Sequence, residues 1–440
     1  MSLEATSVSD DPLSMLAAPT ELAAAAPPAP PPPPYAPPPP MDPVVTFLGR
    51  SAPKKLHGES SVPATEEGVR MLASCGAWRA AASLSERLLS QSHPVDKLLR
   101  LRWSYIVALL KLREVARAER EMTLLGDLHA ESWQYEGYPG IYPGCTGSMV
   151  PYSLHLLHAL LPAYSGKFDH ALARLYTLLA SEAEAASGSA GAGGGLARRT
   201  QVVLAIVNVL CALHDYPNAA THLEQIIIEV QSEQILPEVQ SEQIILEVQS
   251  EQIILEVQSS AAEEASEPGA TDEDETAKYP SAPKSLTPLL ALLARVYLQL
   301  GNLAAAADAL QRLEASLGAP DASVVLRVTR GMLQMARSQY STALAEFEAA
   351  RALEPANALA ANNAAVCQLY CGALTDAIGT LEAQLKADPC GMHEVIVSNL
   401  SALYQMREGG GAAKEVLERL VVATSADDFD MGVLKLDEPK

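Results

Sequence analysis

Two histidines, His155 and His158, have the spacing that comes nearest to a chemical site in this chain. They lie three positions apart in an apolar stretch that we expect to be helical, so both imidazoles would share one helix face and could bind one metal ion. No Cys, Asp or Glu follows at the spacing of a further ligand. We therefore interpret the pair as packed or solvated side chains and predict no metal site.

The remaining candidates for chemistry are a cysteine pair and a glycine-rich segment. Cys367 and Cys371 are one helical turn apart, beside Ala364 and Ala365, and we interpret them as small apolar packing residues rather than a redox pair. Residues 187–195 are rich in glycine, but no Gly-Lys-Ser/Thr follows, so they predict a flexible linker and not a phosphate-binding loop. The Gly-x-Ser-x-Gly, HExxH and dinucleotide-binding motifs are also missing from the sequence. We predict a protein that is not an enzyme and holds no cofactor.

Charge and composition narrow the classes of partner. The 440 residues carry a net charge of −22, with 31 basic and 53 acidic residues, which argues against nucleic acid as a partner because phosphate contacts need a basic face. The six cysteines show no paired spacing, and the first residues lack the basic and apolar regions of a secretory signal, so we expect a reducing, cytoplasmic location. The longest apolar run, at 286–300, is interrupted by Arg295 and Gln299, so we expect only peripheral association with membranes.

Helical hairpins are predicted along most of the chain. From about Thr65, stretches of 12 to 15 residues rich in alanine and leucine alternate with short turns that contain Gly, Asp or Pro. Near the C-terminus three pairs of residues are each separated by 34 positions, which is the tetratricopeptide period; the pairs are Gly331 and Ala365, Ala343 and Ala377, and Pro355 and Pro389. The sequence predicts an all-α fold, a solenoid of about seven tetratricopeptide-type helical hairpins.

The residue types at these recurring positions suit helix packing. Glycine or alanine lets two helix axes approach to about 8–10 Å, and Phe347 and Leu381 follow the second-helix alanines by four residues, on the same helix face. A proline ends the second helix because it disfavours helical geometry in the residue before it. The predicted packing residues are Ala294, Ala306, Gly331, Ala343, Phe347, Pro355, Ala365, Ala377, Leu381 and Pro389.

Four segments follow from these patterns. Residues 1–43 are rich in proline and predict a disordered tail of extended, polyproline II-like backbone. Residues 44–228 hold less regular helical repeats, and 284–436 hold the regular ones. Between them, 229–283 combine an acidic stretch with a nine-residue tandem repeat that begins at Glu229. A nine-residue period builds no continuous apolar face in a helix or a strand, so we interpret this segment as an insertion.

Residues 135–152, with the sequence YEGYPGIYPGCTGSMVPY, are the most unusual part of the chain. Three prolines and four glycines exclude a helix, and the tyrosines are too many for an ordinary solvated loop. Two interpretations stay open, and both can hold: a loop folded on the solenoid, or a loop that docks a partner. The residues predicted to contact a partner are Tyr135, Tyr138, Tyr142 and Tyr152, together with Asn362 and Asn363 on a later helix.

This loop and several C-terminal segments resemble a known family. The loop, together with 361–370 (ANNAAVCQLY) and with His393, Glu394, Asn399, Leu400, Tyr404 and 434–436, resembles subunit 12 of the trafficking protein particle (TRAPP) complex. The resemblance runs from about Phe47 to Leu436 and leaves out 187–195 and 229–283. The loop is its most specific part, since the repeat positions alone would fit many proteins.

The resemblance implies a non-catalytic scaffold subunit of a TRAPP III-type complex, which tethers vesicles between the endoplasmic reticulum and the Golgi apparatus. It implies other TRAPP subunits as direct partners and, through them, a Rab-family GTPase and coated vesicles, with a link to autophagy. The expected location is cytoplasmic and peripheral, at the ER–Golgi intermediate compartment and the Golgi apparatus.

Two alternatives come from other functional classes. A tetratricopeptide co-chaperone or adaptor would clamp an acidic peptide tail with basic and asparagine side chains of successive repeats, and Asn363 is the lone candidate for that role. A regulatory repeat subunit of a larger enzyme complex, such as an acyltransferase or a glycosyltransferase, is the other.

Overall fold

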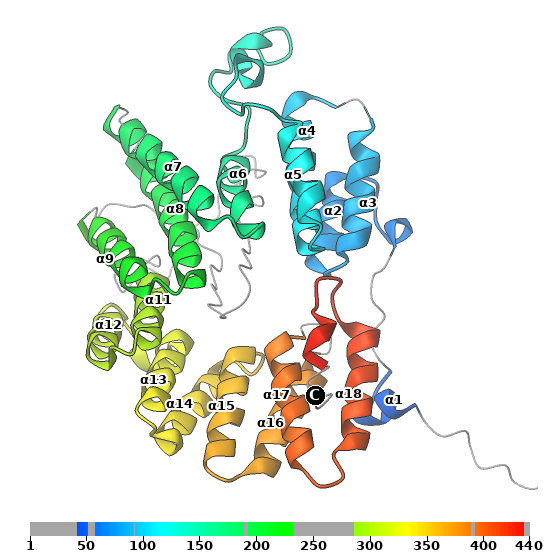
Figure 1. Cartoon of the computed structure of the whole chain (residues 1–440), viewed down its shortest axis with the longest axis vertical. Coiled ribbons are helices and arrows are strands. Elements are labelled where there is room, and N and C mark those ends of the chain that lie inside the picture. Colours follow the sequence, from blue (N-terminus) through cyan, green and yellow to red (C-terminus); the bar gives the residue numbers. More distant parts are fainter. Residues whose placement is uncertain are drawn as a thin grey trace, which may run out of the picture. The chain divides into compact units, whose positions relative to one another are not determined.

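The computed structural model describes residues 42–51, 58–91, 93–188, 192–232, 286–388 and 392–434 (Figure 1). The chain divides into two units, 1–42 and 43–440, and the description below concerns the second. Several sequence predictions lie outside the described residues: the proline-rich tail up to residue 41, the tandem repeat beyond Ser232, Pro389, Lys435 and Leu436.

Within the described residues the regular elements are helices, and consecutive helices pack as hairpins (Figure 1). The first four hairpins are α2 (Glu66–Ser74) with α3 (Trp78–Leu89), α4 (Val95–Lys111) with α5 (Val115–Thr123), α6 (Tyr152–Tyr164) with α7 (Phe168–Gly188), and α8 (Ala192–Ala212) with α9 (Tyr216–Ser232). The next four are α11 (Leu286–Gln299) with α12 (Leu303–Ala315), α13 (Val324–Ala336) with α14 (Tyr340–Leu353), α15 (Ala358–Tyr370) with α16 (Leu374–Ala387), and α17 (Glu394–Met406) with α18 (Gly411–Thr424).

The predicted all-α array of hairpins is therefore confirmed, and the hairpin formed by α17 and α18 is one more than the sequence predicted. A short helix, α1 (Pro43–Leu48), precedes the array and begins one residue inside the predicted tail. Short 3-10 helices lie in the connections between helices: η2 (Glu59–Ser61), η3 (Glu131–Trp133), η4 (Tyr135–Gly137) and η5 (Pro320–Ala322). A fifth, η6 (Met431–Leu434), follows α18.

Several hairpin turns place one residue in the left-handed conformation just after the first helix. Gly301 (φ 77°) does so between α11 and α12, and Ser338 (φ 61°) does so between α13 and α14. The next amide then bonds back into the helix, as in Asn302 N to Tyr297 O at 2.9 Å. This arrangement satisfies a terminal carbonyl while it reverses the chain, which is how a short turn joins two packed helices.

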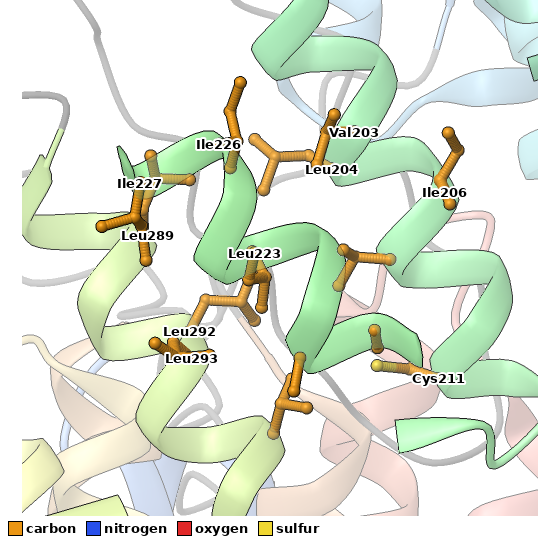
Figure 2. Close-up of a cluster of buried hydrophobic side chains, with 14 of the residues drawn as sticks. Val203, Leu204, Ile206, Cys211, Leu223, Ile226, Ile227, Leu289, Leu292 and Leu293 are labelled. Atoms are coloured by element: carbon orange, nitrogen blue, oxygen red, sulfur yellow. The ribbon is translucent and has the colours of Figure 1, made fainter. Parts of the chain in front are cut away.

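The core continues across the long segment that separates α9 from α11. Figure 2 shows side chains of α8, α9 and α11 in one buried cluster, with Leu223 and Ile227 of α9 near Leu289 and Leu293 of α11. α9 itself runs to Ser232, so it includes the first Glu-Val-Gln-Ser copy. The interruption between Ser232 and Leu286 therefore does not break the stacking of successive hairpins.

The described part of the glycine-rich segment at 187–195, which the sequence predicted to be a flexible linker, is helical. α7 continues to Gly188 and α8 begins at Ala192, so only 189–191 lie outside the described residues. Helices α7 and α8 pack on each other as a hairpin, so the described part of the segment extends two packed helices. The composition of a short Gly/Ala stretch was therefore a poor guide to its backbone.

Helix α8 contains a longer apolar stretch than residues 286–300, where we expected the longest apolar run. Among the described residues it is the one helix long and apolar enough to cross a membrane, over Gly195–Ala212. Side chains of this helix form part of the buried cluster in Figure 2, and 56% of that stretch is buried inside the protein. A core helix passes the same test of length and composition, so this is weak support for a span.

The packing residues named from the sequence lie at helix contacts. A Cβ added at Gly331 would lie 2.6 Å from the ring of Phe347, which is fully buried within the same hairpin. Helix α14 ends at Leu353, two residues before Pro355. The other described residues of the set are also buried; they are Ala294, Ala306, Ala343, Ala365, Ala377 and Leu381.

Pro162 lies inside α6, where its missing N–H leaves the carbonyl of His158 without its usual helical donor. Arg174 of α7 supplies a substitute, because its Nη1 donates to the His158 carbonyl oxygen at 3.0 Å. The proline is buried near the end of the helix, which stops after Tyr164. A side chain of the paired helix thus completes the backbone hydrogen bonding of α6.

Candidate partner-binding loop

The loop predicted at 135–152 has a closed base. Gln134 and Ser148 form an isolated antiparallel bridge. Tyr135 N donates to Gly147 O at 2.9 Å, and Met149 N donates to Trp133 O at 2.8 Å. These bonds bring the two ends of the loop together, as in a compact Ω-loop with a fixed shape.

Three tyrosines hold the loop against the array. Tyr135, Tyr138 and Tyr142 are partly buried against the cluster of α2 to α6, and the rings of Tyr135 and Tyr142 meet edge to face at 5.2 Å. The hydroxyl of Tyr142 donates to Asp96 Oδ1 at 2.6 Å, at the start of α4. The hydroxyl of Tyr138 donates to the Ser132 carbonyl at 3.2 Å, within the loop region. The tyrosines therefore pack on the protein's own surface.

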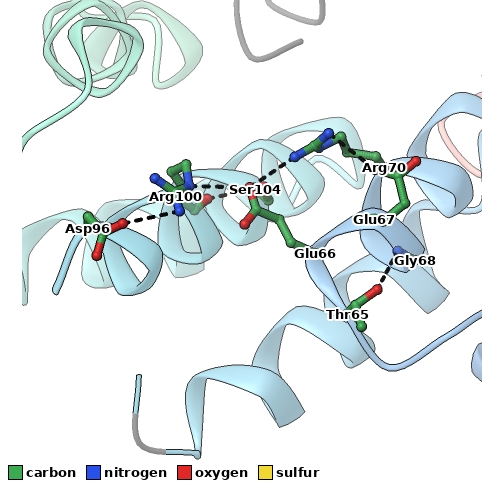
Figure 3. A network of polar contacts seen from close by, with 8 residues as sticks. All are labelled: Thr65, Glu66, Glu67, Gly68, Arg70, Asp96, Arg100 and Ser104. Atoms are coloured by element: carbon green, nitrogen blue, oxygen red, sulfur yellow. Dashed lines mark hydrogen bonds and ion pairs between the residues drawn. The ribbon is translucent and has the colours of Figure 1, made fainter. Parts of the chain in front are cut away.

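Asp96 connects the loop to the first hairpin. Figure 3 shows Arg100 between Asp96 and Glu66, with ion pairs of 3.2 and 3.4 Å, and Arg70 on the far side of Glu66 at 3.3 Å. Burial acts to raise the pKa of Asp96, but the hydrogen bond from Tyr142, the Lys97 backbone and Arg100 together lower it. A carboxylate that stays ionised is a strong acceptor, so it fixes the Tyr142 hydroxyl.

Tyr152 is not part of the same group. It begins α6, its hydroxyl donates to the Arg198 carbonyl at 3.2 Å, and the Arg198 guanidinium lies 5.1 Å from its ring centre. Burial raises the pKa of Tyr152 well above its usual range. This tyrosine therefore joins α6 to α8 and does not line the loop.

The tip of the loop, residues 139–145, is exposed apart from the half-buried Tyr142. Ile141 has 63% of its surface exposed, and Cys145 is an exposed free thiol. Residues 137–151 contain no charged side chain, in a chain with a net charge of −22. The loop tip is therefore a solvent-exposed, uncharged and partly apolar surface. The hydrogen-bonded base and the packed tyrosines attach the loop to the array.

Asn362 and Asn363 lie on α15, in a different part of the array. Asn399 of α17 donates from Nδ2 to Asn362 Oδ1 at 2.8 Å, and both Asn362 and Asn363 are half-buried. Their helix packs in other hydrophobic clusters than the loop does. The structure therefore does not bring these asparagines together with the tyrosines, and Asn362 joins two successive hairpins.

His155, His158 and Cys367 are at least partly buried, whereas Cys371, which we expected to pack beside Cys367, is exposed just after α15. His155 stacks on His129 with ring centres 4.9 Å apart, and burial, aided by the charges of neighbouring histidines, lowers its pKa to about 4. Burial raises the pKa of the Cys367 thiol to about 11, while Cys371 is exposed. Among the described residues no group of three or more His, Cys, Asp or Glu is placed to hold a metal ion.

Two residues of the site escaped sequence reasoning. Asp96 was not singled out because a carboxylate in the first turn of a helix is common, and only the fold shows that Tyr142 reaches it. Ile141 carries the exposed apolar surface between two Pro-Gly pairs. That flanking pattern was the signal that could have identified it, since an apolar residue at a rigid turn rarely finds a core.

Comparison with known proteins supports the resemblance. The chain is 28% identical over 433 residues to mouse trafficking protein particle complex subunit 12, which covers 90% of this chain and 48% of the mouse protein. The human protein of the same name is 27% identical over 90% of this chain and 52% of its own length. The chain thus spans about half the length of the curated relatives it matches. No protein-family model matches it.

Among solved structures, similar chains include a tetratricopeptide repeat protein from Parabacteroides merdae (12% identity, TM-score 0.37, 77% of this chain and 96% of that one). Ypp1 is similar at 13% identity and a TM-score of 0.44, over 89% of this chain and 48% of that one. The resemblance inferred from the Tyr/Pro/Gly loop is confirmed by the sequence comparison: along nine-tenths of its length, this chain is similar to subunit 12 of the TRAPP complex.

Proposed function

We propose that this chain is a non-enzymatic scaffold subunit of a TRAPP III-type vesicle-tethering complex, acting in transport from the endoplasmic reticulum to the Golgi apparatus and in autophagy. Its similarity to TRAPP subunit 12 over 90% of the chain supports this proposal. So does the array of stacked hairpins, a form of protein that offers extended surfaces to other proteins. Its direct partners are other TRAPP subunits, and it meets a Rab-family GTPase, coated vesicles and the membrane through them.

The exposed loop tip is the observation that carries the docking part of the proposal. Binding costs less when the binding surface is already ordered, and the hydrogen bonds of the loop base and of Tyr142 to Asp96 tie this loop to the array. Interface centres are poor in charge and rich in apolar anchors, which describes Ile141 and its neighbours. The tip is the surface at which we propose that another subunit docks.

A pair of matched substitutions tests the role of the loop. Ile141→Asp places a charge on the tip, and Val422→Asp does the same on α18, where Val422 is 70% exposed. Tagged forms of both full-length variants are expressed in cells and purified, and co-purified TRAPP subunits are quantified. Burying an unpaired charge in an interface opposes binding, so Ile141→Asp is expected to lower recovery by about tenfold or more.

The Val422→Asp variant serves as the control for added charge and for folding. It is expected to recover TRAPP subunits as the unaltered chain does. Equal recovery by all three proteins would show that the loop is not the docking surface, while recovery of no TRAPP subunit by the unaltered chain would refute the proposed function itself.

A further inference from the structure

The segment that follows α18, residues 426–430, lies against the turn between α2 and α3. Asp427 N donates to Gly76 O at 2.9 Å, across most of the length of the chain. Gly76 is in the left-handed conformation (φ 68°), and a Cβ added there would lie 2.5 Å from the Cβ of Ala426. The backbones of the two segments therefore meet at a point where no side chain would fit. We call residues 426–430 the acidic segment.

The carboxylate of Asp427 caps α3. Its Oδ2 accepts from Arg79 N at 3.0 Å, while Ala77, at the N-cap position of α3, has no side-chain acceptor to offer. The first amides of a helix need an acceptor from outside the helix, and they favour a negative charge. The first repeat thus receives from the distant acidic segment the cap that its own sequence lacks.

Basic side chains of two successive hairpin turns continue the contact. Lys111 Nζ lies 3.4 Å from Asp428 Oδ2, and Arg113 Nη1 lies 3.3 Å from Asp430 Oδ2. With Arg79, whose Nη1 is 3.9 Å from Asp427 Oδ1, each of the three aspartates meets one basic residue. We call Gly76, Arg79, Lys111 and Arg113 the basic site. Its spacing matches an Asp-Asp-x-Asp sequence whose backbone turns at residues 427–428, where Phe429 N donates to Ala426 O at 3.2 Å.

The two sides of the acidic segment are held by different forces. Phe429 and Val433 pack on the apolar cluster of α17, which keeps the segment attached to the last hairpin. Toward the basic site the contacts are polar, and Arg79 is 77% exposed while Asp427 is 17% exposed. Ion pairs at such a surface are weakened by salt and by competing charges. The pairs of Arg79 and Arg113 are the exposed ones, whereas the Lys111–Asp428 pair is more buried, with exposed fractions of 18% and 26%. The polar contacts are thus separate from the apolar contacts of Phe429 and Val433.

We propose that the basic site is a recognition site for acidic peptide segments and that residues 426–430 are its resident intramolecular ligand. The tether makes this ligand locally concentrated, at an effective concentration in the millimolar range. An acidic segment of another protein reaches the site only when the resident one leaves it. The closed form then has the site occupied, and the open form presents Lys111, Arg113 and the uncapped α3 to a partner.

A peptide-binding measurement on the full chain tests the proposal. A fluorescent peptide with the sequence of residues 424–431 is titrated with the unaltered chain and with an open variant, Asp427→Ala/Asp428→Ala, and its anisotropy is followed. The open variant is expected to bind at least about tenfold more tightly, because the resident ligand no longer competes. The same peptide with asparagine at its three aspartate positions is expected to bind the open variant about tenfold more weakly.

Two further variants complete the test. Lys111→Ala/Arg113→Ala in the open background removes the receptor and is expected to abolish binding, while Asp308→Asn/Glu415→Gln, an equal charge change on other helices, is expected to match the unaltered chain. Hydrogen exchange at the start of α3 is expected to be faster in the open variant, roughly 5- to 10-fold, as for a lost helix cap. Absent peptide binding to the open variant, equal binding of the aspartate and asparagine peptides, or unchanged exchange would overturn the proposal.

Discussion

At Gly331 two helices of one hairpin approach so closely that a single added carbon has no room. The ring of Phe347 would lie 2.6 Å from a Cβ there, whereas a Cβ at Gly379, on the exposed side of α16, meets nothing within 4 Å. We predict that Gly331→Ala destabilises the protein by about 1–3 kcal/mol through overpacking. Gly379→Ala should stabilise it by about 0.5–1 kcal/mol, since alanine is the better helix former. Urea unfolding of both variants measures the two effects, and equal shifts would refute the close approach.

The buried imidazole of His155 is expected to make the folded chain less stable at acid pH. Burial holds its pKa at about 4 in the folded chain, helped by His129, His158 and Arg198, against an ordinary value near 6.5. The unfolded chain therefore binds a proton that the folded chain does not between those values, so this contribution is fully present above about pH 6.5 and is lost as the pH falls toward 4. We expect the free energy of unfolding to fall by about 1–2 kcal/mol over this pH range because of His155, after allowing for solvent screening at this partly buried ring.

A comparison with His155→Phe isolates that contribution from other acid effects. The phenylalanine ring fills a similar space but cannot take up a proton. The free energy of unfolding of this variant should fall less between pH 7.5 and pH 4.5 than that of the unaltered chain. Identical pH dependence of the two proteins would show that His155 is not held neutral by its surroundings.

At the scale of helices, α6 and α7 are coupled through Pro162 and Arg174. Replacing Arg174 with methionine leaves the His158 carbonyl without its donor, so we expect a loss of about 0.5–1.5 kcal/mol. In a Pro162→Ala background the new amide can serve that carbonyl, and the same Arg174→Met change should then cost almost nothing. Denaturant unfolding of the four proteins of this double-mutant cycle gives the coupling energy. An equal loss of stability from Arg174→Met in both backgrounds would contradict the claim that the Arg174 side chain replaces the missing backbone donor of Pro162.

Which helices the sequence could predict depended on local signals. The C-terminal hairpins were predictable because small residues recur every 34 positions where helices touch. The last hairpin lacks that signal, because Asn399 and Glu415 stand 34 residues after Ala365 and Leu381. The segment 187–195 was predicted to be a linker because glycine has a low helix propensity, yet its described residues belong to α7 and α8.

Some features of the candidate site could be predicted from local composition, and others depend on the fold. Composition alone indicated that the tyrosines of the loop must pack on something, and all four do, three on one apolar cluster and Tyr152 on another. Sequence could not show that Tyr142 would find Asp96, or that Tyr152 would turn to α8, because both contacts join residues 46 positions apart. Such pairings depend on how hairpins stack, which no local pattern specifies.

On the scale of the whole array, each terminal hairpin is covered by residues from the other end of the chain. Val44 and Leu48 of α1 pack on Leu420 of α18, and the acidic segment lies on the turn before α3. Repeat arrays need their end faces protected, usually by polar capping repeats. Here α1 packs on the last hairpin, and the acidic segment contacts the turns before α3 and α5 at the other end of the array.

Assembly into a TRAPP complex is the claim from which most of the functional proposals follow. Quantitative mass spectrometry of the tagged full-length chain, purified from cells under native conditions, tests it most directly. We predict that other TRAPP subunits are recovered in a fixed ratio to this chain. A clean purification that recovers the chain in quantity with none of those subunits would contradict the assignment.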